Sequence, residues 1–154
     1  MTVEDRIAEL GIQLPSAPAP MANYVSVQRS GNLLFMSGAG PFENGKPAVT
    51  GKVGLELTLE EGKAAARLTA LNLVSVLKRE VGDLDKVKQI VKILAFVASG
   101  PEFAQQPNVV DGASDILVKI FGDRGKHARS AVAAPILPFY IPVEIEMIVE
   151  IEGQ

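Results

Sequence analysis

The sequence predicts an α+β domain in which two helices pack on one face of a mainly antiparallel sheet. Segments 58–82 and 108–122 have the three- and four-residue apolar spacing of helices, and strand-like segments rich in Val, Ile and Leu alternate with them. Segment 143–152 alternates apolar and mostly acidic residues, which is typical of a strand with one apolar face. Helices and strands interleaved in this order bury their apolar sides by packing in layers.

The first 22 residues predict a short helix and an extended arm. Thr2 can cap a helix over residues 3–10, which has acidic residues in its first turn and Gly11 after its end. Three prolines separated by small residues between positions 15 and 20 then favour a polyproline-like conformation. The arm is therefore expected to cross the surface of the domain.

Residues 24–29 and 33–37 predict a β-hairpin, because the polar turn Ser30-Gly31-Asn32 between them can supply positive φ. Glycine and proline then recur through residues 38–54, which predicts a long loop with one short strand. Gly38-Ala39-Gly40 lacks both the glycine spacing and the following helix of a phosphate-binding loop, so a nucleotide site is not expected there.

The strongest predicted helix begins at a capping box formed by Thr58 and Glu61 and ends at Gly82. Residues 89–97 follow, apolar on both alternations except for one lysine, as expected of a central strand buried on both faces. The predicted apolar stripe of the helix comprises Ala64, Leu68, Leu71, Val74, Leu77 and Val81.

A second helix is predicted over residues 108–121, ending at Gly122 and weakened by Gly112 inside it. With both helices on one face, the other face of the sheet stays apolar and exposed in a single chain. Association with further copies would cover it. The sequence therefore predicts an oligomer built from one domain of 154 residues, 1–154, without a linker or internal repeat.

Candidate site residues concentrate between positions 125 and 152. Arg129 begins one strand-like run, Glu144 lies in the next, and a proline-rich, non-helical connection joins the two runs. If the two runs pair with each other, Arg129 and Glu144 approach one another.

The composition narrows the range of functions. The net charge is −3 and the Lys and Arg residues are scattered, which disfavours a nucleic-acid surface. The sequence has no cysteine and a single histidine, His127, so thiol nucleophiles, disulfides and multi-histidine metal sites are excluded. An acidic N-terminus and the lack of a long apolar run predict a cytoplasmic protein that does not enter the membrane.

The sequence resembles the reactive-intermediate deaminase (RidA/YjgF) family. ARSAV at 128–132, the pair Leu137-Pro138 and VEIE at 143–146 stand at the family's spacing without a gap, and Asn23-Tyr24, LLFMSGAGP and GDLDKV extend the similarity over nearly the whole chain from Tyr24 onward. The N-terminal extension resembles that of a divergent branch of the family. The resemblance implies a chorismate-mutase-like fold and a homotrimer with three clefts between subunits.

The resemblance also implies an activity, the cofactor-free hydrolysis of a reactive enamine or imine, such as 2-aminoacrylate, to a 2-keto acid and ammonia. Arg129 matches the family arginine that clamps the substrate carboxylate, and Glu144 matches the glutamate associated with the hydrolytic water. Further substrate-binding positions are matched by Tyr24, Ser37, Asn108 and Ala131, the last of which stands where the family often has cysteine.

Two other functions stay open. A non-catalytic trimer could use Arg129 to bind or sense a keto acid without activating water. Some members of the family are called endoribonucleases or translation inhibitors, a function that the acidic net charge disfavours. Each candidate also has an ordinary structural interpretation: Arg129 and Glu144 as solvated strand charges, Tyr24 as a strand anchor, Ser37 as a backbone partner and Asn108 as a helix cap. His127 is a secondary candidate, because it titrates near neutral pH, although a single surface histidine is more often uninvolved.

Overall fold

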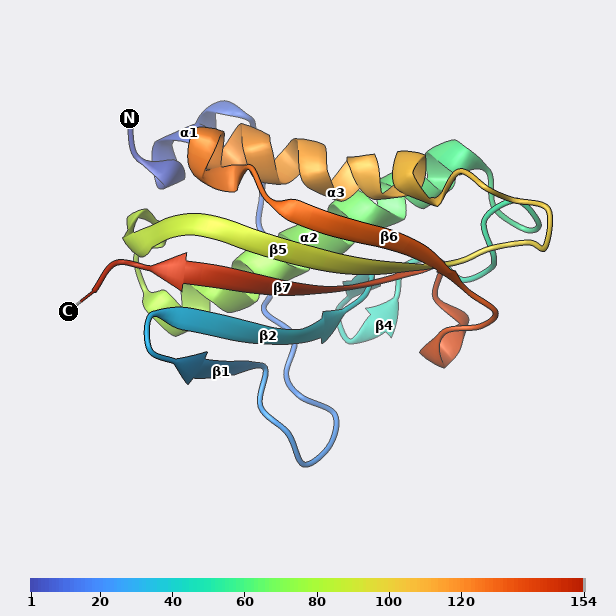
Figure 1. Ribbon diagram of the computed structural model, residues 1–154, viewed down its shortest axis with the longest axis horizontal. Coiled ribbons are helices and arrows are strands. Elements are labelled where there is room, and N and C mark those ends of the chain that lie inside the picture. The colour runs from blue at the N-terminus through green and yellow to red at the C-terminus, as the bar shows by residue number, and fades with distance from the viewer. Residues whose placement is uncertain (154) are drawn as a thin grey trace.

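In the computed structural model, which describes residues 1–153, five strands form a mixed sheet in the order β1-β2-β7-β5-β6, and the helices lie behind it (Figure 1). The helices are α1 (Val3–Glu9), α2 (Leu59–Val81) and α3 (Gln106–Phe121), with three short 3₁₀ turns, η1 (Leu84–Lys86), η2 (Gly122–Gly125) and η3 (Pro138–Tyr140). The strands of the sheet are β1 (Val27–Ser30), β2 (Leu33–Ala39), β5 (Val87–Ala98), β6 (Ala128–Ala134) and β7 (Val143–Ile151), and β3 (Phe42–Glu43) and β4 (Lys46–Pro47) form a separate ribbon.

The predicted α+β class and the mainly antiparallel sheet are confirmed, but the two C-terminal runs do not pair with each other, so the condition for Arg129 and Glu144 to approach within one chain is not met. β5 lies between β6 and β7, parallel to the first and antiparallel to the second (Figure 1). The cause is the α3 crossover, because a strand, a helix and a second strand joined in this way make the two strands parallel neighbours. The proline-rich connection 135–142 then carries the chain past β5 to its other edge.

The connection between β6 and β7 has a defined shape, as its prolines predict. Phe139 and Tyr140 both have a φ of 58°, in the left-handed region that non-glycine residues seldom occupy. Tyr140 Oη donates a hydrogen bond to Glu56 Oε2 at 3.0 Å, and the Phe139 ring packs edge-on against Phe42 with the ring centroids 5.9 Å apart. These contacts hold the connection against the loop that follows β2.

Helix α2 forms the centre of the helical layer. Its predicted capping box is present in both halves, with Glu61 N donating to Thr58 Oγ1 at 3.1 Å and Thr58 N donating to Glu61 Oε1 at 3.0 Å. The predicted stripe is correct at Leu71, Val74 and Leu77, but Ala64 is exposed and Leu68 and Val81 are only half-buried. Every residue from 69 to 77 is buried, because the helix is packed between the sheet, α3 and the N-terminal arm.

Helix α3 starts two residues earlier than predicted, and its N-cap, Gln105, makes no side-chain capping hydrogen bond. Asn108 therefore lies within the first turn, and its interpretation as a cap is wrong. Gly112 has a weak helix propensity, but the packing of α3 requires glycine at this position. A Cβ at Gly112 would lie 2.1 Å from the backbone oxygen of Lys63, so only glycine lets α2 and α3 approach this closely.

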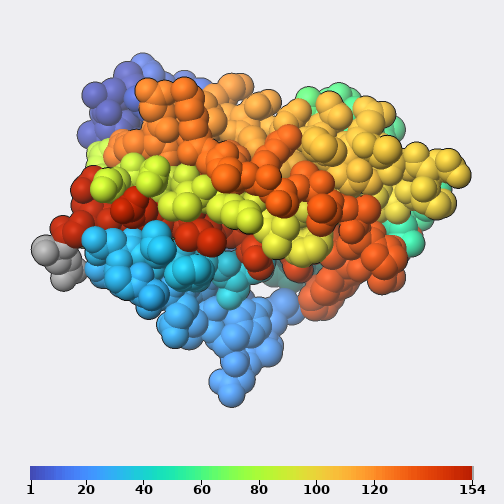
Figure 2. Space-filling view, viewed as in Figure 1, coloured from blue at the N-terminus to red at the C-terminus, as the bar shows by residue number. Residues whose placement is uncertain are grey.

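The two faces of the sheet differ in burial. In β5, Ile93, Ala95 and Val97 are 0% exposed against the helices, whereas Leu94 and Phe96 on the other face are half-buried. β5 is thus not buried on both faces within a single chain, contrary to the expectation. This other face, which we call the open face, is turned toward the viewer in Figures 1 and 2. Its apolar side chains include Phe35, Leu94, Phe96, Val132 and Ile148.

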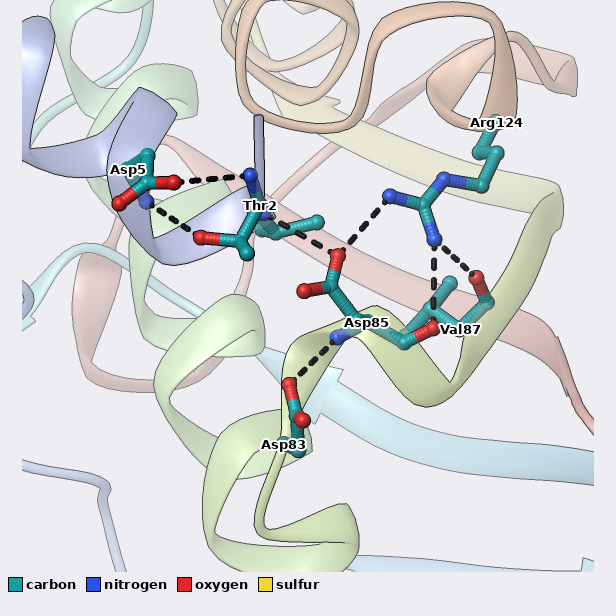
Figure 3. Close-up of polar contacts among 7 residues, drawn as sticks. Thr2, Asp5, Asp83, Asp85, Val87 and Arg124 are labelled. Carbon is teal, nitrogen blue, oxygen red and sulfur yellow. Dashed lines mark hydrogen bonds and ion pairs between the residues drawn. The ribbon is translucent and has the colours of Figure 1, made fainter.

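The N-terminal helix is fixed by a polar junction around Asp85 (Figure 3). Asp85 Oδ1 accepts a hydrogen bond from Val3 N at 3.2 Å and lies 3.2 Å from Arg124 Nη2, and Arg124 Nη1 donates to the carbonyl of Val87 at 3.0 Å. Thr2 caps α1 as predicted. The proline arm that follows is tied to α2, where Ser75 Oγ donates to Pro15 O at 2.7 Å.

The first strand of the hairpin is shorter than predicted, since β1 begins at Val27 and leaves Tyr24 outside it. No helix within residues 1–153 combines the length and the apolarity needed to cross a lipid bilayer.

Candidate active site

Tyr24 and Ser37 line an open pocket of about 590 Å³ between the proline arm, β2 and α2, which we call the arm pocket. Ser37 Oγ donates to the carbonyl of Val25 at 2.7 Å, and Tyr24 Oη accepts from Met21 N at 3.4 Å. None of the pocket's lining residues within 1–153 is charged. The arm pocket therefore offers apolar surface and neutral hydrogen-bonding groups.

Glu144 lies beside the end of β2, on the open face of β7. A Cβ at Gly38 would be 3.2 Å from the Glu144 carboxyl carbon, so glycine at that position leaves room for the carboxyl group. Glu144 makes no side-chain hydrogen bond or ion pair with any other residue in the described range 1–153. Burial raises the pKa of Glu144, and the nearby Glu146 carboxylate raises it further. A half-buried carboxyl group with a raised pKa is suited to general acid–base chemistry, because its protonated form is more readily populated than that of a solvated glutamate.

Arg129 lies on the other side of the sheet, in register with the buried Ile93, and points toward α3. Its Nη1 donates to Ser114 Oγ at 3.1 Å and lies 2.9 Å from Asp111 Oδ1, and its Nη2 donates to the carbonyl of Pro107 at 3.2 Å. A guanidinium group carries five hydrogens, and Nε and Nη2 each keep one that no residue within 1–153 accepts. Two such donors match the two oxygens of a carboxylate.

His127, the secondary candidate, is half-buried and belongs to the same hydrogen-bonded cluster. Its Nε2 lies 2.9 Å from Ser114 Oγ and its Nδ1 lies 2.7 Å from the carbonyl oxygen of Gly125. Ser114 and Asp111 are not among the residues predicted from the sequence, although their spacing gives a signal. Positions 107, 111 and 114 are spaced by four and three residues, which places them on one face of α3.

The remaining candidates lie near Arg129. Asn108 is exposed in the first turn of α3, between Pro107 and Asp111, and its side chain makes no hydrogen bond to another residue in 1–153. Ala131 is two residues beyond Arg129 on the same face of β6 and packs against the core.

A single chain does not bring Arg129 and Glu144 together. Arg129 pairs with Ile93 on the helix side of β5, whereas Glu144 pairs with Phe96 on the open face. One chain thus carries two separate candidate half-sites, the Arg129 cluster on the helix side and Glu144 with Gly38 on the open face. Residues 1–153 contain no group of three or more His, Asp or Glu side chains placed to hold a metal ion.

Comparison with known proteins places the chain in a known family. The family model described as "YjgF/chorismate mutase-like, putative endoribonuclease" matches residues 4–151, and the chain belongs to this RidA/YjgF family. Protein TCP17 of Trypanosoma cruzi is 45% identical over 98% of this chain and 95% of its own length. Among solved structures, protein Atu1372 of Agrobacterium tumefaciens, of unknown function, is 46% identical and superposes with a TM-score of 0.91 over 97% of this chain and 92% of its own.

A putative endoribonuclease from Shewanella oneidensis MR-1 is 33% identical and superposes with a TM-score of 0.95, over 98% of this chain and 100% of its own. Similarity over this share of the chain includes the N-terminal helix and arm, so the extension is a shared part of the fold in these relatives.

Proposed function

We propose that the protein is a cytoplasmic, cofactor-free deaminase that hydrolyses reactive enamines or imines, such as 2-aminoacrylate, to 2-keto acids and ammonia. The observation that carries the proposal is the chemical complementarity of the two half-sites. Arg129 keeps two hydrogen-bond donors for a carboxylate, and Glu144 is an unpaired carboxyl group whose pKa is raised.

The proposed site lies between subunits of a homotrimer, where Arg129 of one copy faces Glu144 of the next. The family resemblance supports this arrangement, and so does the apolar open face, on which Phe35 and Val132 are 43% and 44% exposed in the single chain. Neutral groups of the arm pocket, including Tyr24 and Ser37, lie close to Gly38 and would surround the remainder of the substrate.

In the proposed reaction, Arg129 binds the carboxylate of a 2-imino acid and fixes its C=N bond near Glu144. The Glu144 carboxylate takes a proton from water while the water oxygen bonds to the imine carbon, and it passes that proton to the imine nitrogen to give a neutral carbinolamine. The Glu144 carboxylate then takes the hydroxyl proton of the carbinolamine and gives it to the nitrogen, so the C–N bond breaks and ammonia leaves as the C=O bond forms. Binding energy at Arg129 serves to orient the substrate, and Glu144 supplies general acid–base catalysis.

Two substitutions test the roles separately. Arg129→Lys keeps the charge but loses the planar fork, so it should weaken binding of a 2-keto acid by about 10- to 100-fold, the loss of a charge-assisted hydrogen bond. Glu144→Gln keeps the shape but removes the base, so imine hydrolysis should fall by ~10²–10⁴ while keto acid binding survives. Imines would be generated in place by an amino acid oxidase, with ammonia release and calorimetric titration of 2-oxobutanoate as the readouts.

The outcomes discriminate between the functions. Arg129→Lys that binds and turns over like the unmodified protein contradicts the carboxylate clamp. A protein that binds keto acids without accelerating imine hydrolysis is instead a binding or sensing trimer. RNA cleavage that survives both substitutions would favour the endoribonuclease activity named for the family, which the net charge of −3 disfavours.

A further inference from the structure

A chain of hydrogen bonds with a fixed direction runs from Gly125 to Arg129. The Gly125 carbonyl can only accept, so the His127 Nδ1 atom 2.7 Å away must carry a hydrogen and donate it. In the neutral ring this leaves His127 Nε2 as an acceptor, and the Ser114 hydroxyl 2.9 Å away donates to it. Ser114 Oγ then presents its lone pairs to Arg129 Nη1, which donates to it at 3.1 Å.

This chain acts on the side of the guanidinium group that the proposed substrate does not use. Ser114 and Asp111 contact Nη1, and the unused hydrogens lie on Nε and Nη2. An arginine side chain loses rotamer entropy when it is immobilised. A side chain that is already held in place has less entropy to lose when a ligand binds, so it binds more tightly.

We infer that Ser114 and His127 are positioning residues that hold the Arg129 guanidinium group with its Nε and Nη2 donors turned outward. This inference rests on the proposed function, in which those donors bind a carboxylate. His127 reaches Arg129 only through the Ser114 hydroxyl, so its role is to orient that hydroxyl. Neither residue touches the reacting atoms.

The test uses the intact protein and measures binding and turnover separately. Ser114→Ala and His127→Phe should each raise the dissociation constant for 2-oxobutanoate about 3- to 10-fold, the loss of one ordinary hydrogen bond. They should raise KM for the imine by a similar factor and leave kcat within about threefold, because the lost contact helps the ground state and the transition state equally. Asp115→Ala is the matched control, since Asp115 is an exposed neighbour on α3 outside the network.

Conservative variants distinguish a positioning role of Ser114 and His127 from a role in packing alone. His127→Gln can place an amide oxygen near the Nε2 position and accept from Ser114, so it should bind keto acid more tightly than His127→Phe. Ser114→Thr keeps the hydroxyl and should bind more tightly than Ser114→Ala. If Ser114→Ala folds poorly, the comparison of keto acid binding by His127→Phe and His127→Gln still tests the positioning role.

A double-mutant cycle decides whether the effect passes through Arg129. In an Arg129→Lys background, Ser114→Ala should cost little further binding, because the group it positions is already gone. An undiminished loss in that background overturns the inference, as does unchanged binding in both Ser114→Ala and His127→Phe. These results differ from failure of the proposed function itself, in which Arg129→Lys alone leaves keto acid binding unchanged.

Discussion

Replacing Gly112 by alanine should destabilise the protein, although alanine is the better helix former. Propensity alone favours Gly112→Ala by about 1 kcal/mol in a helix interior. The added Cβ would lie 2.1 Å from the Lys63 carbonyl oxygen, so α2 and α3 would have to separate by about 1.3 Å to restore an ordinary contact. A backbone oxygen cannot rotate away, so the overpacking cost lies at or above the upper end of ~1–3 kcal/mol. The net loss is expected to be about 2 kcal/mol or more.

Urea unfolding followed by circular dichroism, at one fixed protein concentration, measures this loss as a lower midpoint. Ala64→Gly is the control, because Ala64 is exposed on α2 and should show only the propensity cost of about 1 kcal/mol. Asp111 and Ser114 flank Gly112, so Gly112→Ala should also weaken 2-oxobutanoate binding. A variant that is more stable than the unmodified protein would refute the close approach of the two helices.

Three further predictions concern the core, the titration of the site and the assembly. Leu71→Ala should cost ~2–5 kcal/mol in the same urea experiment, since Leu71 is 5% exposed, and a cost below about 0.5 kcal/mol would contradict its burial. Folding raises the pKa of Glu144, so the native state binds more protons than the unfolded state between the ordinary and the raised pKa, and stability falls as the pH rises through that window. Glu144→Gln should therefore melt at a higher temperature than the unmodified protein at pH 7 and at the same temperature near about pH 3, whereas equal melting at both pH values would refute the raised pKa. Light scattering should give the mass of three 16.3 kDa subunits, and a single-subunit mass at micromolar concentration would remove the proposed interfacial site.

Features set by neighbouring residues could be predicted from the sequence. The capping box of Thr58 and Glu61, the Gly31 turn and the alternation in β7 each depend on side chains a few positions apart, and each occurs in the structure. Strand order depends instead on contacts distant in sequence. Period-two alternation shows which residues share a face but does not show which strand lies beside which, so the intervening β5 was missed.

The residues of the candidate site also divide into those that short motifs identify and those that only tertiary contacts identify. Arg129 and Glu144 stand out through short motifs, and the structure adds the half-buried, unpaired state of Glu144. Ser114 and Asp111 reach Arg129 from another element, so their importance depends on how α3 packs on β6. The composition of the sequence cannot predict such a contact. Gly112 is a similar case, because its weak propensity is visible in the sequence but the oxygen of Lys63 opposite it is not.

The position of β5 between β6 and β7 has a genetic consequence. A side chain cannot pass through a sheet, so the guanidinium group of Arg129 and the carboxyl group of Glu144 must act on one substrate from two different polypeptides, if they act on one substrate at all. An Arg129→Lys subunit still carries a normal Glu144, and a Glu144→Gln subunit still carries a normal Arg129. The two impaired variants, co-expressed in one cell, should therefore complement each other in mixed assemblies, whereas a chain carrying both substitutions should rescue neither.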